Sequence, residues 1–150
     1  MVAGDTPIPQ ACTVRRLIIE PKPDRRRRIA ILDDDIDVAR GLAAGLVELG
    51  FEGTAFTTEA QLDAALQFDS FDASVIDWVL ANGTADALVA KLRSQSATCL
   101  IALLTGKAGS KEVGEKELVA AIEQHGLRFL QKPVTVSIAA SQFSAAFANR

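Results

Sequence analysis

The strongest constraint on the fold is a regular alternation of apolar and amphipathic segments that begins after residue 28. Short apolar runs typical of buried strands occupy residues 29–32, 51–57, 71–78, 98–106 and 128–131. Patterns typical of helices follow them at residues 37–50, 58–68, 84–94, 111–125 and 136–148. Five such repeats predict one doubly wound α/β domain at residues 29–150, with a parallel sheet covered by helices on both faces.

Residues 1–28 are predicted to form a basic, proline-containing tail or linker. This segment holds four of the five prolines, and seven Arg or Lys against three Asp or Glu, in a chain of net charge −3. We interpret its "RRRR" run at residues 25–28 as solvated linker rather than nucleic-acid contact, because no aromatic residues interleave with it to stack on bases. We also expect no direct nucleic-acid contact from the domain that follows.

The sequence predicts a soluble cytoplasmic protein without a membrane partner. No apolar run approaches the roughly 20 residues that a membrane span requires, and the start "MVAGDTPIPQ" lacks the order of a secretory signal. The two cysteines, Cys12 and Cys99, show no metal-binding spacing, and we interpret Cys99 as a small core residue.

Acidic residues gather where the first predicted strand ends, in "ILDDDID". Asp33 and Asp34 follow that strand directly, Asp77 ends the third strand, Thr105 ends the fourth, and Lys132 follows the fifth. Because parallel strands bring their carboxyl ends to one edge of a sheet, we expect these side chains to converge.

Carboxylates crowded at one edge repel one another unless a cation lies between them. A bound Mg²⁺ resolves the repulsion, since this hard cation prefers oxygen ligands. A hydroxyl and a lysine beside such a site suit a phosphoryl group, and a carboxylate can itself be the nucleophile that forms an acyl phosphate. We interpret the neighbouring Asp35 and Asp37 as acids of the first helical turn rather than as metal ligands.

In this order, the residues resemble the receiver domain of two-component response regulators, the CheY-like fold. The motifs that match are Asp33-Asp34, Asp77, Thr105-Gly106 and Lys132-Pro133. Each alone is a weak signal, but together, each at a strand's carboxyl end, they form a specific pattern. The resemblance covers about residues 28–147 and implies a flavodoxin-like (βα)5 three-layer sandwich with strand order 2-1-3-4-5.

The resemblance also implies a role for each site residue. Asp77 looks like the phosphoacceptor, which takes its phosphoryl group from a phosphohistidine on a sensor histidine kinase or a phosphotransfer protein. The implied ligands of Mg²⁺ are Asp33, Asp34, Asp77 and the backbone carbonyl of Val79. Thr105 and Lys132 would contact the phosphoryl oxygens, and Thr105 and Phe129 would be the switch residues.

The expected function is therefore a phosphorylation-dependent signalling switch that changes its output face. It would not be an enzyme beyond catalysing its own phosphorylation and dephosphorylation, and homodimerisation is left open. No output domain follows the last helix, so we expect a stand-alone receiver or a piece of a larger regulator or hybrid kinase.

Three features depart from the receiver pattern. Ala81 stands where receivers usually have proline, the segment "GKAGSKEVGEKE" is longer than usual, and Lys107 lies where receivers tune hydrolysis of the acyl phosphate. The longer segment leads to the fourth helix, part of the receiver output face, and this puts standard dimerisation there in doubt.

Two alternative functions stay open. One is a degenerate receiver that acts only as a protein-interaction module. The other is an aspartyl phosphatase of the haloacid dehalogenase type, for which "LDDDID" supplies an Asp-x-Asp pair. Such phosphatases need further acidic ligands after the lysine, but residues 133–150 contain no Asp or Glu.

Overall fold

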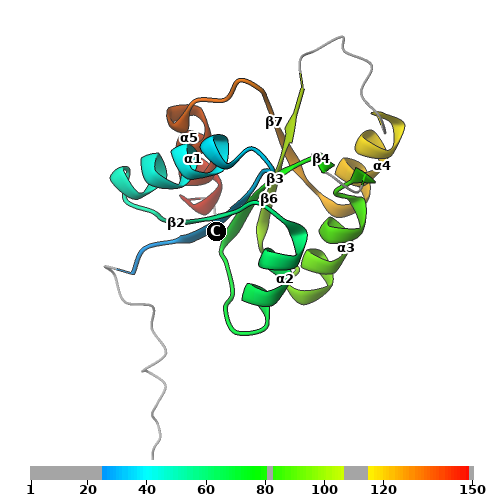
Figure 1. Cartoon of the computed structure of the whole chain (residues 1–150), viewed down its shortest axis with the longest axis horizontal. Coiled ribbons are helices and arrows are strands. Elements are labelled where there is room, and N and C mark those ends of the chain that lie inside the picture. The colour runs from blue at the N-terminus through cyan, green and yellow to red at the C-terminus, as the bar shows by residue number, and fades with distance from the viewer. Residues whose placement is uncertain (1–24, 81–82, 107–114, 149–150) are drawn as a thin grey trace, which may run out of the picture.

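A five-stranded, wholly parallel sheet forms the centre of the computed structural model, which describes residues 25–80, 83–106 and 115–148 (Figure 1). Its strands are β1 (Arg28–Leu32), β2 (Glu52–Phe56), β3 (Ala73–Asp77), β6 (Leu100–Thr105) and β7 (Arg128–Gln131). Their order in the sheet is β2-β1-β3-β6-β7. Counted within this sheet alone, the order is 2-1-3-4-5, so the predicted fold is confirmed.

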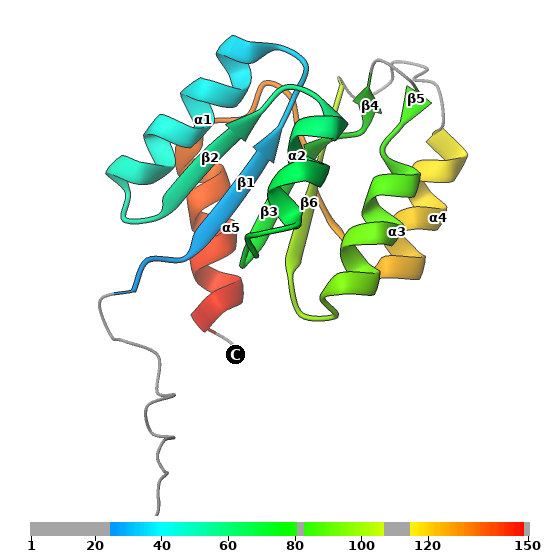
Figure 2. The same ribbon diagram turned by 60° about the horizontal axis from the view of Figure 1, so that its bottom comes forward.

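Five helices cover the sheet on both sides (Figure 2). They are α1 (Ile36–Glu48), α2 (Glu59–Leu66), α3 (Asp86–Gln95), α4 (Glu115–His125) and α5 (Val136–Ala148). Helices α1 and α5 enclose one apolar core against the sheet, and α2, α3 and α4 enclose the other. Alternate residues of β1 serve the two cores, with Ile29 and Ile31 on the α1 side and Ala30 and Leu32 on the other.

Side chains cap the starts of α1 and α2. Asp35 Oδ1 accepts hydrogen bonds from the N–H groups of Asp37 at 3.0 Å and Val38 at 3.4 Å. Thr58 Oγ1 accepts from the N–H of Gln61, whose side chain accepts from the N–H of Thr57. Asp35 thus belongs to the helix terminus, as the sequence indicated.

A short antiparallel hairpin follows β3 and was not predicted. It pairs β4 (Val79–Leu80) with β5 (Gly83–Thr84), and the N–H of Ala85 closes it by donating to Trp78 O at 2.8 Å. Thr84 of β5 accepts a hydrogen bond from the N–H of Asp86 at 3.5 Å, and Ala85 is the residue that precedes α3.

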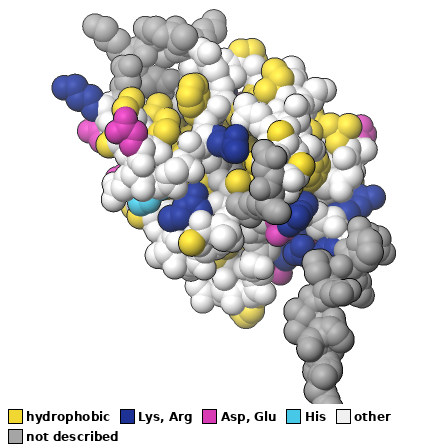
Figure 3. All heavy atoms as spheres, turned by 180° about the vertical axis from the view of Figure 1, so that it is seen from behind, with side chains coloured by type: hydrophobic (Ala, Val, Ile, Leu, Met, Phe, Trp, Pro, Cys, Tyr) yellow, Lys and Arg dark blue, Asp and Glu magenta, His cyan; other side chains and the backbone are white. Residues whose placement is uncertain are grey.

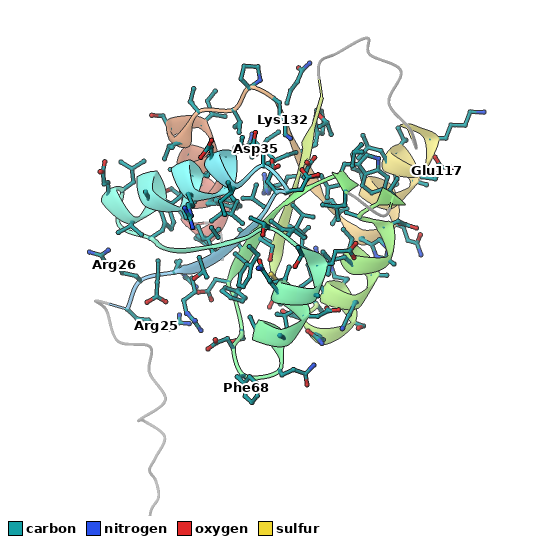
Figure 4. The ribbon with its side chains drawn as sticks, viewed as in Figure 1. Arg25, Arg26, Asp35, Phe68, Glu117 and Lys132 are labelled. Atoms are coloured by element: carbon teal, nitrogen blue, oxygen red, sulfur yellow. The ribbon has the colours of Figure 1, made fainter. Side chains whose placement is uncertain are left out.

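The arginines at residues 25–28 contact the amino edge of the sheet. Arg28 Nε lies 2.7 Å from Glu52 Oε1, and the Arg27 guanidinium carbon lies 4.6 Å from the centre of the Phe147 ring. Arg25 lies 3.5 Å from Asp72 Oδ2, and Arg26 donates to the backbone oxygens of Val47 and Phe51; both are labelled before β1 in Figure 4. This part of the predicted linker is solvent-exposed but tied to the domain.

The rear of the molecule carries apolar side chains toward its upper end and basic side chains across its middle (Figure 3). Exposed apolar residues of the elements at the β7 edge are Val119, Phe129 and Ile138. Within the described part of the chain, no helix is long and apolar enough to cross a membrane.

Two glycines near the contact of α1 with β2 test this packing. A Cβ on Gly53 would lie 2.8 Å from the backbone oxygen of Ala43, whereas a Cβ on Gly41 would meet nothing within 4 Å. Gly53→Ala should therefore lower the free energy of unfolding by about 1–3 kcal/mol. Gly41→Ala, on the exposed side of α1, should raise it by about 0.5–1 kcal/mol. Urea denaturation measures the free energy of unfolding of both variants. Equal changes in the two would contradict the close contact between α1 and β2 at Gly53.

Candidate functional site

The side chains that the sequence predicted to converge do meet at the carboxyl edge of the sheet. Asp33 directly follows β1 and is fully buried, and its N–H donates to Phe56 O of the neighbouring strand at 3.1 Å. Asp77 ends β3 and is only 7% exposed. Lys132 follows β7, where its N–H donates to Thr105 O at 2.8 Å. Backbone pairing of the parallel strands therefore brings these residues together.

Three carboxylates form a compact acidic group at this edge. Asp33, Asp34 and Asp77 each offer one oxygen atom, and these oxygens lie within 4.8 Å of one another. Asp33 Oδ1 accepts from the N–H of Asp35 at 2.9 Å, whereas the buried Asp33 Oδ2 has the Lys132 ammonium as its neighbour, at 3.1 Å. A buried carboxylate oxygen with one cationic neighbour, beside two further carboxylates, fits a hard divalent cation such as Mg²⁺.

Lys132 supplies positive charge to this group. Its Nζ lies 3.1 Å from Asp33 Oδ2 and 3.2 Å from Asp77 Oδ2, so that the ammonium bridges the two buried acids. Figure 4 shows Lys132 at the carboxyl edge, near the start of α1 that Asp35 marks. Burial alone lowers the pKa of Lys132, but its hydrogen bonds to, and attraction by, Asp33 and Asp77 outweigh burial and raise that pKa.

The electrostatics of Asp77 are dominated by its burial. Loss of solvent, followed by repulsion from Asp33, raises the pKa of Asp77 from 3.8 to about 6. Attraction and a hydrogen bond from Lys132, and a backbone hydrogen bond from Val79, oppose this rise without cancelling it. A single lysine thus compensates only part of the negative charge.

The other predicted site residues lie in three different settings. Thr105 is buried at the end of β6, and Phe129 is 57% exposed on the edge strand β7. Val79 lies in the hairpin, where its backbone reaches the Asp77 carboxylate. The Lys132–Pro133 peptide bond is cis. The departures at Ala81 and Lys107 lie outside the described residues.

Sequence reasoning missed the hairpin that carries Val79. Pairing of Val79 with Thr84, and of Leu80 with Gly83, fixes the backbone directly after Asp77. Two-residue strands leave no periodic pattern, and the signal for the hairpin in the sequence is the Asn-Gly dipeptide at positions 82 and 83, a pair typical of tight turns. Trp78, between the site and this hairpin, is fully buried.

Comparison with solved structures places the fold among response regulator receiver domains. The chain is similar to a CheY-like receiver domain protein from Methanospirillum hungatei JF-1, with a TM-score of 0.72 and 20% identity over 83% of this chain and 96% of that chain. A two-component response regulator from Clostridium difficile matches at a TM-score of 0.71 and 20% identity, over 82% of this chain and 97% of that one. The chemotaxis response regulator CheY4 of Vibrio cholerae matches at a TM-score of 0.68 and 20% identity, over 81% of this chain and 99% of that one.

No protein-family model and no curated protein sequence matches the chain. At about 20% identity, the likeness to solved structures establishes the fold. The protein thus has the CheY-like receiver fold, with a cluster of three aspartates and a lysine at the carboxyl edge of its sheet.

The raised pKa of Asp77 predicts a pH-dependent change in stability. The folded state holds this proton more tightly than the unfolded chain, so ionisation of Asp77 costs stability as pH rises from 3.8 to about 6. In metal-free buffer, Asp77→Asn should therefore stabilise the protein at pH 7.5 by up to about 3 kcal/mol, and far less at pH 4. Urea denaturation of both proteins with a chelator measures the difference, and a difference independent of pH would contradict this reasoning.

Proposed function

We propose that the protein is a phosphorylation-dependent signalling switch, in which Asp77 accepts a phosphoryl group from a sensor histidine kinase or a phosphotransfer protein. The observation that carries the proposal is the Lys132 ammonium held between Asp33 and Asp77 at the carboxyl edge of a receiver fold. A fixed cation beside a buried carboxylate attracts the charged oxygens of a phosphoryl donor and orients them toward Asp77.

Asp77 is the nucleophile in this proposal. Its carboxylate oxygen forms a bond to phosphorus while the bond from phosphorus to the donor histidine nitrogen breaks, and the product is an acyl phosphate. Water later cleaves this acyl phosphate and restores the carboxylate. Because the pKa of Asp77 is about 6 in the absence of a metal ion, the carboxylate is mostly ionised, and therefore nucleophilic, at neutral pH.

The residues that would hold Mg²⁺ are Asp33, Asp34, Asp77 and the backbone carbonyl of Val79. When bound, the ion would neutralise charge on the phosphoryl oxygens. Lys132 and Thr105 would bind the remaining phosphoryl oxygens, and the exposed ring of Phe129 would respond to the new position of Thr105. The output of this switch would pass to an effector that recognises the α4–β7–α5 side.

The two alternatives account for less of the site. A haloacid dehalogenase-type phosphatase would use Asp35 as its second acid, but the Asp35 carboxylate is engaged by the first turn of α1. A degenerate receiver would not need the acidic group and the lysine to be intact together. We therefore favour the phosphoacceptor role.

Phosphorylation of Asp77 is tested with radiolabelled acetyl phosphate and Mg²⁺. The wild-type protein should take up one base-labile label, because an acyl phosphate hydrolyses in base. Asp77→Asn should abolish labelling, whereas Asp35→Asn, which keeps a helix-capping side chain, should retain it. Labelling that survives Asp77→Asn would overturn the proposal, and repeated turnover of a phosphate ester would favour the phosphatase.

Metal binding is tested by the fluorescence of Trp78, the single tryptophan, which is buried next to Asp77. Titration with Mg²⁺ should change its emission in the wild-type protein, and Asp34→Ala should abolish the change. Asp35→Ala is the matched control, since it should leave Mg²⁺ affinity almost intact while weakening the α1 cap by about 1 kcal/mol. If both variants lost Mg²⁺ binding equally, the assignment of Asp34 as a ligand would be wrong.

A further inference from the structure

The β4–β5 hairpin directly follows Asp77 in the chain, and Figure 2 shows it at the carboxyl edge of the sheet, next to the start of α3. Trp78 joins the hairpin to the sheet. Its N–H donates to Leu104 O of β6 at 2.9 Å, and its carbonyl accepts from the N–H of Ala85 at 2.8 Å. One residue thus connects the central sheet with the end of the hairpin, so the hairpin is held against the strand that carries Asp77.

The pairing of this hairpin turns the backbone of Val79 outward. In an antiparallel ladder, residue pairs that exchange two hydrogen bonds alternate with pairs that exchange none. The bond from the N–H of Ala85 to Trp78 O marks that pair as hydrogen-bonded. The next pair along, Val79 with Thr84, is therefore of the other kind. The N–H and the carbonyl of Val79 consequently point away from β5, toward groups outside the ladder.

The N–H of Val79 is engaged at the site. It donates a hydrogen bond to the Asp77 carboxylate. The Lys132 ammonium holds Oδ2 of the same carboxylate, at 3.2 Å. Two donors from different elements restrict rotation of the Asp77 side chain. A fixed orientation favours attack on phosphorus, since the nucleophile must be aligned with the atom that it attacks.

Gly83 is the residue that allows this ladder to close. Its φ is +127°, in a region that residues with a side chain rarely adopt. Gly83 pairs with Leu80 at the closed end of the hairpin, so its conformation sets the pairing of Val79 one step further along. A Cβ on Gly83 would meet nothing within 4 Å. A substitution at this position therefore strains the backbone of the hairpin without a steric clash.

We propose that Gly83 is a positioning residue of the phosphoacceptor site: it closes the β4–β5 hairpin, and the hairpin holds the backbone of Val79 against Asp77. The inference rests on the phosphoryl transfer proposed above and adds a residue outside the acidic group on which its geometry depends. The N–H of Val79 keeps the Asp77 carboxylate in the orientation that attacks phosphorus. The hairpin also keeps the Val79 carbonyl in place for the metal ion that the acidic group would hold.

Two glycine substitutions test this role. Gly83→Ala adds a methyl group at φ +127°, and Gly50→Ala adds one at φ +99°, likewise with nothing within 4 Å. Gly50 lies at the amino edge of the sheet, between α1 and β2, so the pair compares equal chemical changes near the site and far from it. Both variants should fold with a lowered melting temperature, because the strain is local and neither residue belongs to the two apolar cores.

Hydrogen exchange of the Val79 amide, followed by nuclear magnetic resonance, reports on the hairpin directly. Gly83→Ala should speed this exchange by about tenfold or more, and Gly50→Ala by less than about twofold. Gly83→Ala should also slow the labelling of Asp77 by acetyl phosphate at saturating Mg²⁺ by about tenfold or more. It should raise the Mg²⁺ concentration at the midpoint of the Trp78 fluorescence change by about tenfold. Gly50→Ala should leave labelling and the midpoint as in the wild-type protein.

The outcomes separate this inference from the proposed function. Equal effects of the two substitutions, or labelling that Gly83→Ala leaves unchanged, would overturn the positioning role. If the wild-type protein took up no label, the phosphoacceptor role would fail. Exchange of the Val79 amide would then still show whether Gly83 holds this backbone, and unchanged exchange in Gly83→Ala would overturn the inference by itself.

Discussion

The structure at the carboxyl edge depends on the repulsion between buried carboxylates, which one lysine relieves only in part. Like charges about 4 Å apart repel by about 1 kcal/mol in water and by about 4 kcal/mol near a protein surface. Lys132 bridges Asp33 and Asp77, yet the pKa of Asp77 stays near 6. The site therefore keeps an excess of negative charge, which is the condition for binding a divalent cation.

This crowding is possible because the two apolar cores hold the strand ends in place. β1, β3 and β6 are adjacent in the sheet, and their core-facing residues are almost all buried. Burial of these apolar side chains stabilises the fold by about 25 cal/mol per Å², enough to offset the unfavourable charges at one edge. The hairpin after Asp77 adds local order, since its ladder ties Val79 to Thr84.

Most of the fold and the site could be predicted from the sequence, because both follow from periodic patterns. Strand β7 and helix α5 have the bounds that the pattern indicated, and Asp33, Asp77 and Lys132 meet because parallel strands share an edge. The β4–β5 hairpin is too short to show a period. The contacts of the arginine run depend on the distant residues Glu52 and Phe147, and no local pattern encodes such pairings.

The unsatisfied buried atoms show where this protein gives up stability. Among the described residues, Ser74 Oγ and Trp78 Nε1 are buried without a hydrogen bond, and the buried Asp33 Oδ2 has only the Lys132 ammonium, at 3.1 Å. Each such group costs about 1–3 kcal/mol, and chance would scatter them through both cores. Instead, all three belong to β1, β3 or the residues directly after them, at the two edges where the surface is hollow or acidic. Sites that bind ligands tolerate such groups because the ligand supplies a further partner, and for Asp33 Oδ2 a bound divalent cation would add to the single lysine.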